Sequence, residues 1–194
     1  MNKIILSCLL AFFVVPAFSQ VNFGLKGGLN MANIKGTSAQ EVYENRTGFH
    51  VGLFAGAKFQ RIGIQPEMIL SSQGTQFDLA GESVVEKFTY FNIPVMLKFY
   101  PVKMLNIQAG PQFGFLMGAK EITQTETIDV KASYKSSDVS LGLGLGLELP
   151  FGINLEGRYN LGLSDINDSS GQNSEIIKNQ VFQISIGLRV LDKG

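Results

Sequence analysis

The chain has 194 residues, about the length of a single domain, and its 16 basic residues balance its 16 acidic residues to a formal net charge of zero. This balance argues against a nucleic-acid partner, because such partners require a net positive surface. Cys8 is the only cysteine and His50 the only histidine. Disulfides, thiolate metal sites and sites built from several histidines are therefore excluded for the mature chain.

The first segment, residues 1–19, has the layout of a secretory signal peptide. A short, positively charged start precedes an apolar run that is briefer than the about 20 residues of a membrane-spanning helix. Small residues stand at the two positions that a signal peptidase reads, which predicts cleavage before Gln20 or close to it. Cys8 lies too early in the run for a lipoprotein anchor. We predict a signal peptide over 1–19 and one β-barrel domain over 20–194.

From residue 23 onward, apolar residues alternate with polar residues or glycine, which is the period of a β-strand. Eight segments show this alternation: 23–31, 49–59, 62–70, 91–99, 105–115, 139–149, 153–161 and 182–190. Most reach the roughly 9 to 11 residues that a tilted strand needs to cross a membrane, and they exceed the usual strand length of about 5 to 6 residues. Their length favours a membrane barrel.

The connections between these segments alternate between long and short. The long ones are expected over residues 32–46, 73–86, 118–137 and 164–178, and tight turns over residues 60–61, 101–104 and 150–152. Long outer loops and short periplasmic turns are the asymmetry of bacterial outer-membrane barrels. An even number of strands then leaves both ends of the barrel domain in the periplasm.

A strand in hydrocarbon must pair every backbone group, so only a closed barrel spans a bilayer with strands. We therefore predict an all-β fold, an eight-stranded antiparallel up-and-down transmembrane β-barrel, with its apolar face towards lipid. Aromatic residues near the strand ends predict two interfacial girdles. These are Phe23, Phe59, Phe99 and Phe151 on the turn side and Phe49, Phe91, Phe115 and Phe182 on the loop side. The inner face is polar and rich in glycine.

The interior of an eight-stranded barrel is just wide enough for side chains to fill, which argues against a wide solute channel. Charged residues fall on the inward positions of several strands and are expected to form an interlocked network of ion pairs. They are Lys26, Lys58, Glu67, Lys98, Glu148, Glu156, Arg158 and Arg189. The alternative is a path for protons or ions through the same residues.

Six motifs in the same order resemble the PorT-type outer membrane β-barrel proteins of Bacteroidetes-like bacteria. They are FGLKGGLNMA at 23–32, GFHVGLFAGAKF at 48–59, IQPEMILSSQG at 64–74, YFNIPVMLKFYP at 90–101, AGPQFGFLMGAK at 109–120 and GRYNLGLSDI at 157–166. The resemblance covers the whole mature chain. It implies a small barrel in the outer membrane of a Gram-negative cell, and the member that named the family is tied to protein export.

Candidate catalytic and metal-binding residues are few. His50 is the one side chain able to act as the base of a hydrolytic triad, for which Ser71 or Ser72 and a carboxylate would be its partners. A satisfied polar residue of the lumen is the favoured interpretation of His50, and the triad is the alternative. No other combination of residues suggests catalysis.

The acidic segment with Asp165, Asn167 and Asp168 has the composition of a calcium loop but lacks its glycine and glutamate spacing. Gly142, Gly144 and Gly146 lie within a strand and are not followed by a helix, which excludes a phosphate loop. We expect no cofactor and no metal.

The leading hypothesis is a non-enzymatic outer-membrane barrel with a filled lumen, in a structural or accessory role that includes protein secretion. Its expected partners are outer membrane lipid and a protein bound through the long loops, above all 118–137, or through the periplasmic turns. We expect a monomer. The alternatives are a soluble, secreted, lipocalin-like barrel that binds an apolar ligand and an outer-membrane enzyme that modifies lipids.

Overall fold

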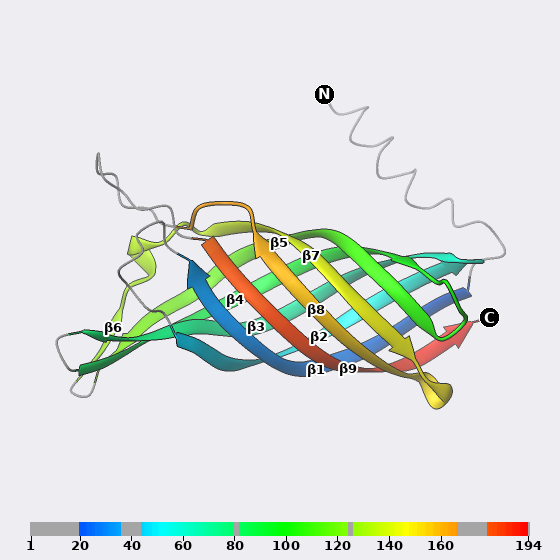
Figure 1. Ribbon diagram of the computed structural model, residues 1–194, viewed down its shortest axis with the longest axis horizontal. Helices are drawn as coiled ribbons and strands as arrows, with labels where there is room; N and C mark the ends of the chain where they lie inside the picture. The colour runs from blue at the N-terminus through cyan, green and yellow to red at the C-terminus, as the bar shows by residue number, and fades with distance from the viewer. Residues whose placement is uncertain (1–19, 36–43, 80–81, 124–125, 167–177, 194) are drawn as a thin grey trace, which may run out of the picture.

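The computed structural model describes residues 20–35, 44–79, 82–123, 126–166 and 178–193 (Figure 1). The predicted signal peptide, residues 1–19, lies outside this part of the chain. The strands are β1 (Gln20–Lys35), β2 (Glu44–Phe59), β3 (Ile62–Leu79), β4 (Glu82–Phe99), β5 (Leu105–Ile122), β6 (Thr127–Asp129), β7 (Ser137–Glu148), β8 (Ile153–Gly162) and β9 (Lys178–Lys193). Two single-turn 3-10 helices, η1 (Lys131–Ser133) and η2 (Pro150–Gly152), complete the secondary structure. No helix within these ranges has the length and apolar character needed to cross a lipid bilayer.

Eight long strands form a closed antiparallel barrel, as the sequence predicts. Each strand pairs with its neighbours along the chain, β5 pairs with β7, and β1 closes the ring by pairing with β9. The three-residue strand β6 lies outside this ring and pairs with the last residues of β5. In ring order, β1, β2, β3, β4, β5, β7, β8 and β9, the strands β3 and β8 are therefore on opposite walls of the barrel.

Exposure alternates along the strands, with apolar residues outward and polar residues inward. On β5, for example, Ile107 is 51% exposed, whereas its neighbour Gln108 is 1% exposed. On β8 and β9, Asn160 and Gln183 are each 2% exposed, whereas Ile186 is 61% exposed. The predicted assignment of the two faces is confirmed, and it is the reverse of a lipocalin-like barrel, whose apolar face lines the interior.

The predicted connection over residues 73–86 is wrong, because β3 continues to Leu79 and β4 already begins at Glu82. The connection over 118–137 is likewise partly strand, since β5 extends to Ile122 and β6 follows. Alternation is weak in these segments because strand ends that protrude into water need no apolar outer face. The sequence pattern therefore ends where the membrane ends, whereas backbone pairing continues.

The two ends of the barrel differ (Figure 1). At one end, β1 begins and β9 ends, and the turn over residues 60–61, the bend over 101–104 and η2 connect the strands. At the other end, the last residues of β3, the first residues of β4 and the last residues of β5 project beyond the remaining strands together with β6. Outer-membrane barrels place short turns in the periplasm and longer connections outside. We therefore expect the projecting end, here named the outer extension, to face the exterior.

Candidate functional site

Five charged side chains meet in the middle of the barrel and are named here the central cluster. Lys26 comes from β1, Glu67 from β3, Lys98 from β4, and Glu156 and Arg158 from β8. Each occupies an inward position of its strand, so the pleat directs all of them to the barrel axis. Their side chains are at most 4% exposed.

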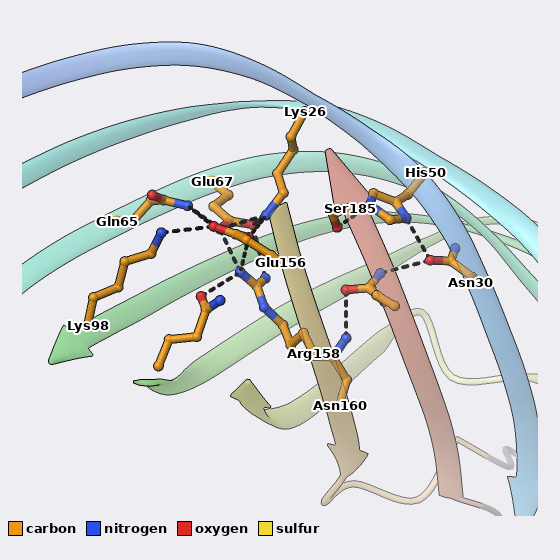
Figure 2. A network of polar contacts seen from close by, with 12 residues as sticks. Lys26, Asn30, His50, Gln65, Glu67, Lys98, Glu156, Arg158, Asn160 and Ser185 are labelled. Carbon is orange, nitrogen blue, oxygen red and sulfur yellow. Dashed lines mark hydrogen bonds and ion pairs between the residues drawn. The ribbon is translucent and has the colours of Figure 1, made fainter. Parts of the chain in front are cut away.

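The contacts within the central cluster form an ion-pair network in which every charged side chain has an oppositely charged partner, although Arg158 Nε itself has no hydrogen-bond partner among the described residues (Figure 2). Arg158 donates two parallel hydrogen bonds to Glu67, from Nη2 to Oε1 at 2.7 Å and from Nη1 to Oε2 at 3.0 Å. Such a fork is the strongest geometry of an arginine–carboxylate pair. Glu156 accepts from Lys98 Nζ at 2.8 Å and also from Lys26, whose ammonium lies 3.2 Å from Glu67. The two carboxylates thus share all three cations.

Two amide side chains complete the coordination of this cluster. Gln65 Nε2 donates to Glu67 Oε1 at 2.8 Å, and Gln108 Oε1 accepts from Arg158 Nη2 at 3.1 Å. Both amides are buried. Sequence reasoning missed these two residues, although their inward alternation on β3 and β5 was available as a signal.

The order of the strands around the barrel shows that the Arg158–Glu67 pair joins opposite walls. Because β8 and β3 are on opposite walls, a side-chain pair at 2.7 Å and 3.0 Å between them extends across the barrel axis. Lys98 and Glu156 form a second bridge, between β4 and β8, which are three places apart in the ring. At this depth, charged side chains that are bonded to one another occupy the centre of the lumen.

The other three predicted residues of the network, Lys58, Glu148 and Arg189, lie near the turn end of the barrel and do not join the central cluster. Arg189 Nη1 is 3.9 Å from Glu148 Oε2. The phenolic O–H of Tyr100 donates to Glu148 Oε1 at 2.6 Å, and Lys58 Nζ lies 3.5 Å from the centre of the Tyr100 ring. Tyr100 lies just beyond the end of β4. Its pKa is raised, mainly because the side chain is buried and secondly because it donates a hydrogen bond to Glu148.

His50 belongs to a third group of polar residues, on the loop side of the central cluster (Figure 2). The Nδ2 group of Asn30 donates to Ser71 Oγ at 2.9 Å and to the backbone oxygen of Ser72 at 2.9 Å. Asn30 Oδ1 is therefore the acceptor for His50 Nδ1, at 2.8 Å. The other ring nitrogen, His50 Nε2, then accepts from the hydroxyl of Ser185 at 2.8 Å.

The structure contradicts the alternative in which His50 pairs with Ser71 or Ser72 and a carboxylate, and it agrees with the favoured interpretation of His50 as a hydrogen-bonded polar residue of the lumen. Its hydroxyl partner is Ser185 on β9, which alternation alone does not bring next to β2, and its second partner is an amide. His50 is 2% exposed and Ser185 is 4% exposed, and both point into the lumen. An acyl ester in the surrounding lipid would not reach this hydroxyl.

The outer extension contains an apolar cluster that sequence reasoning did not predict. Phe88, Tyr90, Leu116 and Ala119 are at most 4% exposed, and Val130 and Tyr134 pack against them. The ring of Tyr134 meets that of Phe88 edge-on at 4.8 Å between centroids, and its O–H donates to Glu86 Oε1 at 2.8 Å. The segment after β6 is thereby held against the outer ends of β4 and β5, and we name this arrangement the outer cap.

The part of the chain that the structure describes contains no group of three or more histidine, cysteine, aspartate or glutamate side chains that could hold a metal ion. In the suggested calcium loop, Asn167 and Asp168 lie outside the described residues. The remaining member, Asp165, accepts a hydrogen bond from Lys135 Nζ at 3.1 Å.

Comparison with known proteins agrees with this architecture. The family model described as "Outer membrane protein beta-barrel domain" matches residues 17–168. Neisserial surface protein A (NspA) is similar in structure with a TM-score of 0.60 and 9% identity, over 86% of this chain and 96% of that one. Ail, the attachment invasion locus protein of Yersinia pestis, follows with a TM-score of 0.50 and 15% identity, over 88% of this chain and 98% of that one. These likenesses show the fold alone. No curated protein sequence matches.

Proposed function

We propose that this chain, which belongs to the outer membrane protein β-barrel domain family and lies in the outer membrane, is a non-enzymatic barrel with a filled lumen. Its role is to bind another macromolecule at its outer extension. The side chains in the lumen stabilise the barrel, and the surface outside the membrane binds the partner.

The main support for a filled lumen is the hydrogen-bonded ion pair between opposite walls of the barrel. Arg158 and Glu67 are joined by two hydrogen bonds across the barrel axis, and neither side chain is more than 2% exposed. A solute passing this level would have to break a buried ion pair, which costs several kcal/mol.

The surface of the outer extension supports a role in binding. All three residues of β6 are exposed, and Ile128 among them is 42% exposed on a segment that the outer cap holds in place. An apolar side chain displayed on a fixed, exposed element is suited to a protein contact. The buried position of Ser185 supports the non-enzymatic part of the proposal.

The resemblance to PorT-type barrels supports a narrower version, in which the partner belongs to a protein-export apparatus. Removal of the chain from its native bacterium should then reduce the set of proteins exported across the outer membrane. An unchanged set of exported proteins would reject this narrower version. The broader proposal, that the barrel binds a partner at its outer extension, would not be affected.

The filled lumen is tested by single-channel recording in planar bilayers. We expect the wild-type protein to keep a closed baseline, and the Glu67→Ala/Arg158→Ala variant to show openings because the bridge between opposite walls is gone. Lys135→Ala/Asp165→Ala serves as the matched control, because it removes an ion pair outside the central cluster whose side chains are 43% and 31% exposed. A steady conductance of the wild-type protein would contradict the proposal.

The partner contact is tested with a photo-cross-linking residue at Ile128, and with the same residue at Val102 in the turn over 101–104 as the control. Both positions are exposed, at 42% and 60%, but they lie at opposite ends of the barrel. We expect a discrete cross-linked protein from Ile128 only. A product obtained from Val102 alone would move the contact to the periplasmic side.

A further inference from the structure

A β-bulge interrupts the pairing of β4 with β5 just above the loop-side aromatic girdle. Tyr90 lies opposite Leu116, but the next residue, Thr89, lies opposite Gly118, so that Met117 is an extra residue on β5. One additional residue rotates every later side chain of a strand to the other face. The bulge therefore decides which side chains of the outer extension point towards lipid.

Beyond the bulge, the two strands place like charges directly opposite each other. Glu86 is opposite Glu121, and Lys87 is opposite Lys120. The register below the bulge, continued without the extra residue, would instead pair Glu86 with Lys120. Opposite charges in such positions attract, whereas like charges repel. The bulge thus replaces an attractive pair with two repulsive pairs. A group of opposite charge beside either pair would offset this repulsion.

The two repulsive pairs face different surroundings. The glutamates are on the inner side, where Glu86 accepts the hydrogen bond of Tyr134. The lysines are on the outer side: Lys120 is exposed, while its neighbour Ala119, now turned inward, is 0% exposed. Neither ammonium group forms a hydrogen bond or an ion pair with a residue that the structure describes.

The acidic residue nearest in register, Asp129, forms no direct ion pair with these lysines in the described part of the chain. Asp129 on β6 lies opposite Lys120, but its carboxylate accepts the backbone N–H of Lys131 at 2.9 Å and forms no ion pair within 4.0 Å in the described part of the chain. Two cations thus lie side by side on the outer surface, and neither is in a direct ion pair with a carboxylate that the structure describes.

The height of the lysine pair matches the polar zone of the outer leaflet. Lys87 is four residues beyond Phe91, a residue of the girdle that lies opposite Phe115. Four residues extend about 13 Å along a strand, or about 10 Å along the membrane normal at the usual strand tilt. The headgroup zone begins at the girdle, and the flexible stems of the lysines let their ammonium groups reach down into it.

From these observations, we propose that Lys87 and Lys120 bind the phosphate group of a glycolipid in the outer leaflet. A phosphate between the two ammonium groups relieves the repulsion that the bulge creates. The surface just below the lysines leaves room for it: Thr89 presents a hydroxyl there, and its partner Gly118 has open space where a side chain would stand. The site binds the β4–β5 side of the barrel to the surrounding lipid.

The test uses the full folded protein in phosphatidylcholine nanodiscs that contain either bisphosphorylated lipid A or its dephosphorylated form. Native mass spectrometry over a lipid titration gives the apparent affinity. We expect the wild-type protein to prefer the phosphorylated form. The Lys87→Gln/Lys120→Gln variant should bind it about thirty-fold more weakly, which corresponds to about 2 kcal/mol for two lysines near an anionic surface.

The matched control is Lys103→Gln/Lys178→Gln, which removes the same charge from the turn end and from β9, across the barrel from β4 and β5. It should change the affinity less than about twofold, because surface charges more than a Debye length apart are screened from each other. An equal loss in both double variants, no loss in either, or equal wild-type affinity for the two lipid forms would overturn the proposal.

Discussion

At the residue scale, Glu156 occupies the most demanding position in the barrel, buried among three cations. Lys26, Lys98 and Arg158 all lie within 4 Å of its oxygens, and its side chain is 4% exposed. Charged groups are tolerated at such depth only when they are paired and hydrogen-bonded. Residues of this kind set the stability of the whole fold, because the loss of one leaves its partners uncompensated.

We therefore expect Glu156→Gln to lower the free energy of unfolding by about 3 to 5 kcal/mol, as is typical when one member of a buried ion pair is removed. Urea titration of the protein folded into lipid vesicles measures this difference. Glu126→Gln, at an exposed position outside the barrel wall, is the control and should be neutral within about 0.5 kcal/mol. Equal stability of the two variants would show that the central cluster contributes little.

At the element scale, the outer extension and the outer cap depend on each other. β3, β4 and β5 continue beyond the neighbouring strands, and the segment with β6 and η1 folds back onto them through Tyr134. A hairpin of two strands is only marginally stable in water, and three or more strands with an apolar face are needed for independent stability. The cap supplies the apolar contacts that the extension needs outside the membrane.

Removal of the ring in Tyr134→Ala should loosen both parts, because the contact with Phe88 and the hydrogen bond to Glu86 are lost together. Hydrogen–deuterium exchange of the amides in β6 and at the outer end of β5 should accelerate at least tenfold, while β8 stays protected. Tyr134→Phe keeps the ring and should give an intermediate rate. Unchanged exchange in Tyr134→Ala would mean that other contacts hold the cap.

At the scale of the whole molecule, the asymmetry of the two ends fixes the orientation of the barrel. β1 begins and β9 ends on the side of the short turns, and the outer extension lies on the other side (Figure 1). Assembly from the periplasm leaves the short turns there. The lysine pair, the outer cap and β6 are then all displayed to the exterior.

This orientation is measurable because Cys8 is the only cysteine of the chain and belongs to the predicted signal peptide. We expect Lys131→Cys, in η1, to react with a membrane-impermeant maleimide on intact cells. Val102→Cys, in the turn over 101–104, should react only after the outer membrane is permeabilised. Both positions are exposed. The reverse labelling pattern would invert the barrel and with it every contact proposed for the outer extension.

The sequence by itself determined the barrel, because the period of two and the length of each segment follow from the contrast between lipid outside and a polar interior. It also placed Lys26, Glu67, Lys98, Glu156 and Arg158 on the inner face. The same contrast ends at the membrane surface. For this reason, the pattern ended early on β3, β4 and β5, and the outer cap was not predicted.

Only the tertiary structure decided which inward residues meet. Alternation gives the face of a side chain but not its height or its neighbours across the lumen, which depend on strand register and ring order. That is why Arg158 was not assigned to Glu67 on the opposite wall, and why His50 pairs with Ser185 and not with Ser71 or Ser72. The bulge at Met117 could not be predicted for the same reason, because it is a feature of strand register. It turns Lys120 outward without any signal in the sequence pattern.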